Sequence, residues 1–281
     1  MTESPQVQSH LQISTPVDSI FNEFDEIISP YENTEDRLLS KTMRIPELQS
    51  LTNSLLSQPS CAVDVSRAFD LIRAAIDLDS ELAHWARKVP IEWSYTTALR
   101  MKYFYNPRLS SSTFVPNQAH RYPDLYTARV WNLYRVSRLI IQSILFRVSS
   151  CVDLHLKDHY RDRTDKINRS MVEDMCASVP FLLGYDFSEL KRSTSSFHGQ
   201  NLWPQTSVSK ATSSAHTGKF SLIWPLYIAC SVSSVPEAQR RWMRAQLRWI
   251  AETGEAQAQF VHQAESQTLA GGVESFRFDC V

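Results

Sequence analysis

The sequence predicts an all-α protein, an irregular multi-helix bundle preceded by a disordered N-terminal segment. Only 6 of the 281 residues are glycine, about 2% where about 7% is usual. Dinucleotide folds, phosphate-binding loops and β-rich barrels need glycine at turns and phosphate approaches, so this composition disfavours all three. Apolar residues instead recur at helical spacing along several stretches, and strand-like patterns are nearly absent.

Residues 1–60 begin the chain as a polar segment rich in Ser, Thr, Gln, Asn and Pro. Its apolar patches are short, for example Phe24 to Ile28, and they bury too little surface to offset the entropy lost on ordering. We therefore predict a mostly disordered segment with at most one short helix. Its first residues lack the basic flank and apolar core of a secretory signal.

The main domain is predicted over residues 61–270, and its first helix runs from about Cys61 to Lys88. Ser60 fits the N-cap position, Asp64 falls in the first turn, and Pro90 ends the helix. Four apolar residues step by four, three and four positions and therefore share one face: Val65, Phe69, Ile72 and Ile76.

The second helix opens with Pro123 and Asp124 and continues to about Ser149. Its apolar residues cover most of the circumference. Only a narrow polar stripe interrupts them: Arg135, Arg138 and Gln142. A helix that is apolar over so much of its surface is typical of the centre of a bundle.

A third helix is predicted over roughly residues 164–178, with Pro180 as its end. Residues 188–218 are a long polar stretch, which we predict to be a mobile loop. An apolar run follows, from Phe220 to Val232.

The C-terminal part of the domain is predicted to be a helical hairpin. One helix spans residues 236–253 and stops at Gly254, and a second segment spans residues 255–267. Residues 271–281 are left as a tail.

One spacing of cysteine and histidine has the form of a metal site. Cys151, His155 and His159 lie four residues apart, so a continuous helix would place them on one face, where they can bind zinc. Charged residues surround them, and the glutamate of a His-Glu-x-x-His motif is missing. We interpret the stretch as exposed surface and expect no metal site.

A basic stripe marks the helix over 236–253, where Arg240, Arg244 and Arg248 recur every four residues beside tryptophans. Such a stripe can meet phosphate, but it is more often the solvated face of an amphipathic helix. The net charge is -1, from 29 basic and 30 acidic residues. Because this balance gives no support for DNA binding, we expect no direct DNA contact.

Tryptophans give one candidate ligand pocket, lined by Trp93, Trp131 and Trp224, that would enclose a small apolar molecule. The alternative is ordinary core packing, which the sequence favours. No nucleophile elbow, phosphate-binding loop or Cys-x-x-Cys pair occurs, so we expect no catalytic residues and no cofactor. An enzyme of unrecognised class would have to use His155, Asp158 and His159.

Four stretches together resemble the C-terminal helical regulatory region of fungal binuclear zinc cluster transcription factors. They are HWARKVPIEWSY (84–95), YPDLYTARVWNLYRVSRLIIQSIL (122–145), EDMCASVPFLLGYD (173–186) and LIWPLYIACSVSSVPEAQRRWMRAQLRWI (222–250). Members of that family read DNA through six closely spaced cysteines that hold two zinc ions. Here the five cysteines are at least 25 residues apart, so no zinc-ligating or DNA-contacting residue can be carried over.

The resemblance implies a regulatory protein of the nucleus that performs no chemistry. Its partners would be proteins of the transcription machinery, a homo- or hetero-dimer partner, or a metabolite effector, and no membrane is expected. The chain is either part of a longer regulator or a paralogue without the DNA-binding module. A small-molecule-binding helical module and an enzyme of unrecognised class remain the alternatives.

Overall fold

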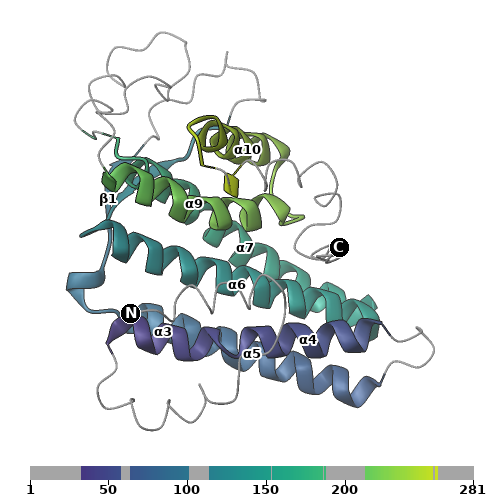
Figure 1. The fold of residues 1–281 in the computed structure, drawn as a ribbon. Helices are drawn as coiled ribbons and strands as arrows, with labels where there is room; N and C mark the ends of the chain where they lie inside the picture. The colour runs from purple at the N-terminus through teal and green to yellow at the C-terminus, as the bar shows by residue number, and fades with distance from the viewer. Residues whose placement is uncertain are drawn as a thin grey trace. The chain divides into compact units, whose positions relative to one another are not determined.

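The computed structural model describes residues 33–57, 64–100, 114–152, 154–185, 187, 213–255 and 257–258. Seven α-helices account for most of these residues (Figure 1): α3 Thr34–Thr42, α4 Ile45–Leu56, α5 Val65–Lys88, α6 Leu125–Val152, α7 Leu154–Leu182, α9 Ser213–Ser231 and α10 Glu237–Glu252. A short 3-10 helix, η3 Ile91–Trp93, and two strands, β1 Thr96–Arg100 and β2 Gln118–Arg121, complete this part of the chain. The all-α prediction is confirmed.

The chain divides into two compact units. The first contains α3, α4 and α5 together with residues 137–168 of α6 and α7. The second contains the β1–β2 hairpin, the start of α6, the end of α7, and helices α9 and α10.

Helices α3 and α4 correct the prediction for residues 1–60, because residues 33–57 form two helices packed on α5 (Figure 1). Asn33 caps α3, accepting from the Glu35 and Asp36 amides while the Asp36 carboxylate accepts from the Asn33 amide. Apolar residues at helical spacing are buried: Leu38, Leu39, Ile45, Leu48 and Leu55. The polar average composition of the segment concealed this periodicity. The two helices are stable because α5 supplies the surface on which their apolar residues pack. Residues 1–32 and 58–60 lie outside the described ranges.

Helix α5 begins at Val65 rather than at residue 61, because Asp64 is its N-cap and accepts from the Arg67 amide at 3.1 Å. The proposed cap Ser60 lies outside the described ranges. The predicted apolar face is only partly the core face, since Val65 is 50% exposed and Phe69 47% exposed. The buried stripe is instead Ala68, Leu71, Ile72, Ala75, Leu78, Leu82 and Trp85.

Part of the polar stripe of α6 faces other helices in the first unit. Arg138 donates to both carboxylate oxygens of Asp79 on α5, at 2.8 and 3.0 Å. The Asp79 side chain is only 2% exposed, and Arg163 of α7 also approaches it, at 3.6 Å. Gln142 is buried as well and accepts from the Thr164 hydroxyl at 3.3 Å. The stripe therefore joins helices instead of contacting water.

In the second unit, an antiparallel hairpin precedes α6. Thr96 pairs with Arg121 and Arg100 with Gln118, with an irregularity in register between Thr97 and Leu99. Strands this short and this polar lack the alternation that predicts a strand.

Helix α7 runs from Leu154 to Leu182 and includes Pro180, so the prediction of a helix over 164–178 ended by that proline is wrong. Its end is set by Gly184, which adopts a φ of 74°. The Gly184 and Tyr185 amides donate to carbonyls of the last helical turn, which is the usual arrangement for a glycine stop.

Helix α9 begins at Ser213, so residues 213–218 are helical and not part of a mobile loop; residues 188–212 lie outside the described ranges. Gly218 allows α9 to approach α7 closely, since a Cβ there would lie 1.9 Å from the Leu182 carbonyl oxygen. Helix α10 occupies the predicted span and is followed by Gly254 at a φ of 99°. Residues 259–281 are not described.

Candidate functional site

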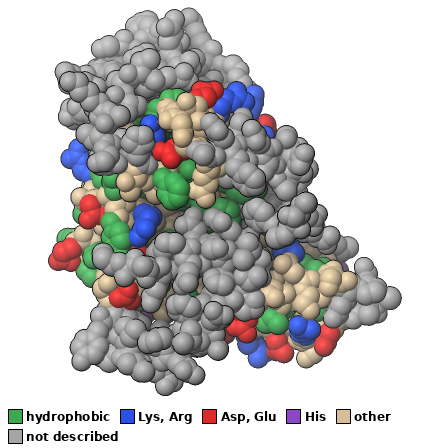
Figure 2. Space-filling model, viewed as in Figure 1, with side chains coloured by type: hydrophobic (Ala, Val, Ile, Leu, Met, Phe, Trp, Pro, Cys, Tyr) green, Lys and Arg blue, Asp and Glu red, His purple; other side chains and the backbone are tan. Residues whose placement is uncertain are grey.

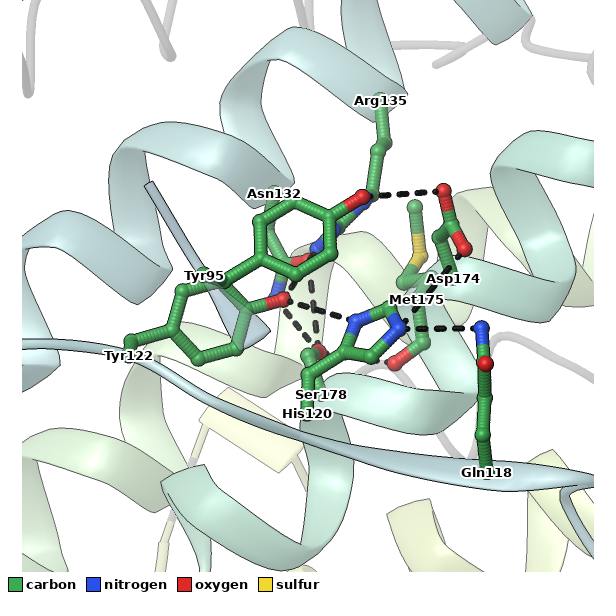
Figure 3. Close-up of polar contacts among 9 residues, drawn as sticks. All are labelled: Tyr95, Gln118, His120, Tyr122, Asn132, Arg135, Asp174, Met175 and Ser178. Carbon is green, nitrogen blue, oxygen red and sulfur yellow. Dashed lines mark hydrogen bonds and ion pairs between the residues drawn. The ribbon is translucent and has the colours of Figure 1, made fainter. Parts of the chain in front are cut away.

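A buried polar cluster lies in the second unit and gathers side chains from the hairpin, α6 and α7 (Figure 3). We call it the Arg135 cluster, and it consists of Tyr95, Gln118, His120, Tyr122, Asn132, Arg135, Asp174, Met175 and Ser178. Met175 contributes its backbone carbonyl, to which the Ser178 hydroxyl donates at 2.7 Å.

Local periodicity explains how these residues converge. Gln118, His120 and Tyr122 alternate along an extended segment, so they share one side of it. Asn132 and Arg135 are one helical turn apart on α6, and the α7 members Asp174 and Ser178 are separated by four residues. The Asn132 amide donates to the Ser178 hydroxyl at 3.1 Å and so joins the two helices.

Arg135 is the centre of the cluster and is 1% exposed. Its Nη1 donates to the Tyr122 hydroxyl at 2.9 Å and to the Asn132 Oδ1 at 2.8 Å. Three rings surround the guanidinium, with centroids 5.2 Å (Tyr95), 5.8 Å (Tyr122) and 5.9 Å (Trp131) away. Its Nη2 is buried without a hydrogen-bond partner among the described residues. The ring faces offset part of the cost of burying this charge.

Asp174 carries a negative charge that interacts electrostatically with the Arg135 guanidinium. The Tyr95 hydroxyl donates to its Oδ2 at 3.4 Å. Burial raises the pKa of Asp174, although Arg135 opposes the change. Burial alone would lower the pKa of Arg135, but Tyr122, Asp174 and Tyr95 outweigh it and the guanidinium pKa is raised.

His120 is neutral at physiological pH. Burial, aided by the charge of Arg135, lowers the pKa of His120 to about 3. Its Nε2 lies 3.0 Å from the Gln118 amide nitrogen and its Nδ1 lies 3.3 Å from the Tyr122 hydroxyl. The 3.9 Å contact of His120 with Asp174 is therefore not an ion pair near pH 7.

The pKa values of the histidine and the two tyrosines in the cluster do not suit proton transfer near neutral pH. Burial raises the pKa of Tyr95 and of Tyr122 above the ordinary value of tyrosine, while the pKa of His120 is far below 7. A general acid or base works best with a pKa near the working pH. The cluster is suited instead to fixing the hairpin against α6 and α7.

A small cavity adjoins the cluster. It has a volume of about 180 Å³ and is lined by Phe114, Pro116, Asn117, Gln118 and Glu173. Gln118 belongs to both the cavity wall and the cluster. Glu173 and Asp174 are consecutive on α7. The Glu173 side chain lines the cavity, and the Asp174 side chain belongs to the Arg135 cluster.

The predicted tryptophan pocket is brought together in part. The Trp131 indole donates to the Trp93 carbonyl at 2.8 Å, and the Trp93 ring packs edge-on against Tyr126. Trp224 lies on α9 and packs against Tyr227. The 180 Å³ cavity has other residues on its walls, and a ligand enclosed by the three tryptophans stays a prediction.

The cysteine and histidine stretch is not one continuous helix. Cys151 lies near the end of α6, whereas His155 and His159 lie on α7, and all three are exposed, as is Asp158. Within the described ranges, no group of three or more His, Cys, Asp or Glu side chains is placed to hold a metal ion.

Arg240, the first arginine of the α10 stripe, forms its contacts within the protein, whereas Arg248 is exposed. Arg240 donates to the carbonyls of Val232 and Val235, both at 3.2 Å, and so braces the link from α9. Arg241 lies 3.8 Å from Glu237. Acidic and basic side chains are interspersed among the described residues on the face that Figure 2 shows. Among the helices described, none combines the length and apolarity needed to cross a bilayer.

Sequence reasoning missed the Arg135 cluster and its cavity. The available signal was Arg135 itself, a cation on a helix that is apolar over most of its circumference. On such a helix a charged residue is more often buried with partners than solvated.

The chain is similar to the transcription factor dbaG of Emericella nidulans, with 28% identity over 210 residues. The match covers 75% of this chain and 47% of that protein, so the chain spans about half the length of the curated relative it matches. This similarity confirms the resemblance to fungal transcription factors. No protein-family profile matches the chain, and no solved structure matches it.

Proposed function

We propose that this chain is the helical regulatory region of a fungal zinc cluster-type transcription regulator, and that its 281 residues do not include the zinc cluster that would read DNA. The observation that carries the proposal is the similarity to the transcription factor dbaG over 75% of the chain. The spacing of the five cysteines supports the second part, because the zinc cluster needs six close together.

The charge distribution supports a role that does not depend on touching DNA. Basic and acidic residues nearly cancel, 29 against 30, whereas neutralising a DNA backbone requires a surplus of positive charge. Arg240, the first arginine of the α10 stripe, is engaged with backbone carbonyls of the same unit.

The proposed mechanism is protein recognition in the nucleus. The partners would be components of the transcription machinery or a second regulator chain, and a metabolite would act as effector. The buried cluster supports a role without chemistry, because its histidine and tyrosines are tuned away from neutral pH.

A tethering assay tests this function. The full chain is fused to a heterologous DNA-binding domain in a filamentous fungus, and a reporter downstream of the matching operator is measured. We expect the reporter level to change severalfold relative to the DNA-binding domain alone. A tagged chain should also accumulate in the nucleus.

A matched pair of variants makes the assay specific. Arg135→Met disrupts the buried cluster and should abolish the reporter response, whereas Arg241→Gln at the exposed end of α10 should preserve it. An unchanged reporter with the wild-type chain, at normal protein level, would overturn the proposal.

A further inference from the structure

The cavity beside the Arg135 cluster has the dimensions of a small-ligand site. Its volume is about 180 Å³, and a protein cavity of about 150 Å³ is enough to hold benzene. A six-membered ring carrying a short polar substituent therefore fits it.

The walls combine three kinds of recognition. Phe114 and Pro116 supply apolar surface, Asn117 and Gln118 supply amide groups, and Glu173 supplies a carboxylate. Glu173 lines the cavity and is exposed, so its side chain is accessible from solvent. Among the described residues, neither lysine nor arginine contributes to the walls.

The chemistry of these walls selects for positive charge. A carboxylate forms charge-assisted hydrogen bonds with ammonium or amidinium groups, and an aromatic face attracts cations. Amide oxygens accept further N–H groups. An anionic ligand would meet the Glu173 carboxylate with no compensating cation among the described wall residues.

We propose that this cavity binds a small organic cation, an ammonium or amidinium group carried on a single ring. The ring packs against Phe114 and Pro116, and the charged group faces Glu173. As a route to effector control the proposal rests on the regulatory function proposed above, whereas the binding step stands on the cavity alone.

The cavity is connected to the core of its unit in two ways. The Gln118 amide nitrogen lies 3.0 Å from His120, so a ligand that binds the Gln118 amide oxygen acts on a side chain that also contacts the Arg135 cluster. The Phe114 ring packs edge-on against Trp242 of α10, with 5.6 Å between centroids. Occupation of the cavity should thus perturb tryptophan emission.

The test compares three probes of nearly equal size on the full chain: benzylamine, benzyl alcohol and benzoate. Affinities are measured by calorimetry and by tryptophan fluorescence. We expect benzylamine to bind about tenfold more tightly than benzyl alcohol, because only the amine forms a charge-assisted pair. Benzoate should bind most weakly.

Variants then assign the preference to the site. Glu173→Gln should remove the preference for benzylamine and leave the affinity for benzyl alcohol unchanged, while Phe114→Leu should weaken both. Glu237→Gln, at an exposed carboxylate on α10, is the control and should change neither affinity. Because Glu173 is exposed, folding of its variant can be verified by an unchanged thermal midpoint.

The proposal is overturned if benzylamine and benzyl alcohol bind equally, if no probe binds, or if the preference survives Glu173→Gln. The tethering assay is independent of these results. A chain that regulates the reporter but binds no cation would remove only this inference, and a chain that binds the cation without regulating would remove only the proposed function.

Discussion

Arg135 shows how a single buried cation organises its surroundings. Its guanidinium reaches two polar groups through Nη1 and is surrounded by three aromatic faces. Asp174 and the tyrosines stabilise its charge, while burial, aided by the same charge, lowers the pKa of His120. The side chains of the cluster therefore depend on one another, and their titration becomes part of the stability of the fold.

His120 should make the protein less stable in mild acid. Its pKa is about 3 in the folded state and about 6.5 in an unfolded chain. Between these values the unfolded chain binds the extra proton, so the free energy of unfolding falls as pH decreases, by up to about 1.4 kcal/mol per pH unit. Urea unfolding followed from pH 7 to pH 4 measures this slope.

His120→Gln is the matched variant, because it removes the titration and keeps an amide for Tyr122. Its slope over the same range should be smaller by about one proton. Asp174 acts with the opposite sign, because burial raises its pKa in the folded state. Between the ordinary aspartate pKa and that raised value the folded chain binds the extra proton, so this group makes the free energy of unfolding increase as pH falls. Equal slopes for both proteins would show that His120 is not the responsible group.

Gly218 should tolerate no side chain. A Cβ would lie 1.9 Å from the Leu182 backbone oxygen, which cannot move without shifting α7. Gly218→Ala should lower the free energy of unfolding by about 3 kcal/mol, at the upper end of overpacking costs. Gly254→Ala is the comparison: it strains a φ of 99° in open space and should cost about 1–2 kcal/mol. Equal losses in chemical denaturation would refute the close approach.

At the scale of elements, α5 carries two carboxylates that make similar contacts in different environments. Asp79 is 2% exposed and accepts two hydrogen bonds from Arg138. Glu81 is 39% exposed and accepts two from Arg44. Their difference isolates the effect of burial on an ion pair.

Asp79→Asn should destabilise the protein by about 3 kcal/mol, because the Arg138 side chain stays largely buried after losing its carboxylate. Glu81→Gln should cost less than about 1 kcal/mol, since water replaces an exposed partner. Chemical denaturation of both variants provides the measurement. A smaller loss for Asp79→Asn than for Glu81→Gln would contradict the burial argument.

The elements differ in how far the sequence could predict them. Helix α10 was predicted closely because its amphipathic stripe, Pro236 and Gly254 all mark the same boundaries. The sequence-based prediction ended helix α7 at Pro180, because a proline disfavours a helix interior. In the structure the helix continues past this proline to Leu182. Helices α3 and α4 were missed because their segment is polar on average while its apolar residues are periodic.

The candidate site was less predictable than the helices. Tyr95, His120 and Asp174 are far apart in the sequence, and no local motif connects them. Their meeting depends on the β1–β2 register and on the packing of α6 with α7, which are tertiary properties. Only Arg135 could have been recognised from its local sequence, because a cation on a helix that is apolar over most of its circumference indicates burial.

At the scale of the whole molecule, charge balance is the property that bears most directly on function. The formal net charge is -1, and arginines such as Arg138 and Arg240 are committed to partners inside the units. Long-range attraction to a polyanion is therefore weak. A regulator of this composition has to reach its genes through another protein or another module.

The purified chain should consequently bind no duplex DNA specifically. In a mobility-shift titration at about 150 mM salt, we expect dissociation constants no tighter than about 1 µM and no dependence on base sequence, as for non-specific binders. Arg248→Gln, at an exposed arginine of α10, should leave even this weak binding nearly unchanged. Nanomolar retention of one particular duplex, as true operator-binding proteins achieve, would mean that α10 or another surface reads DNA directly.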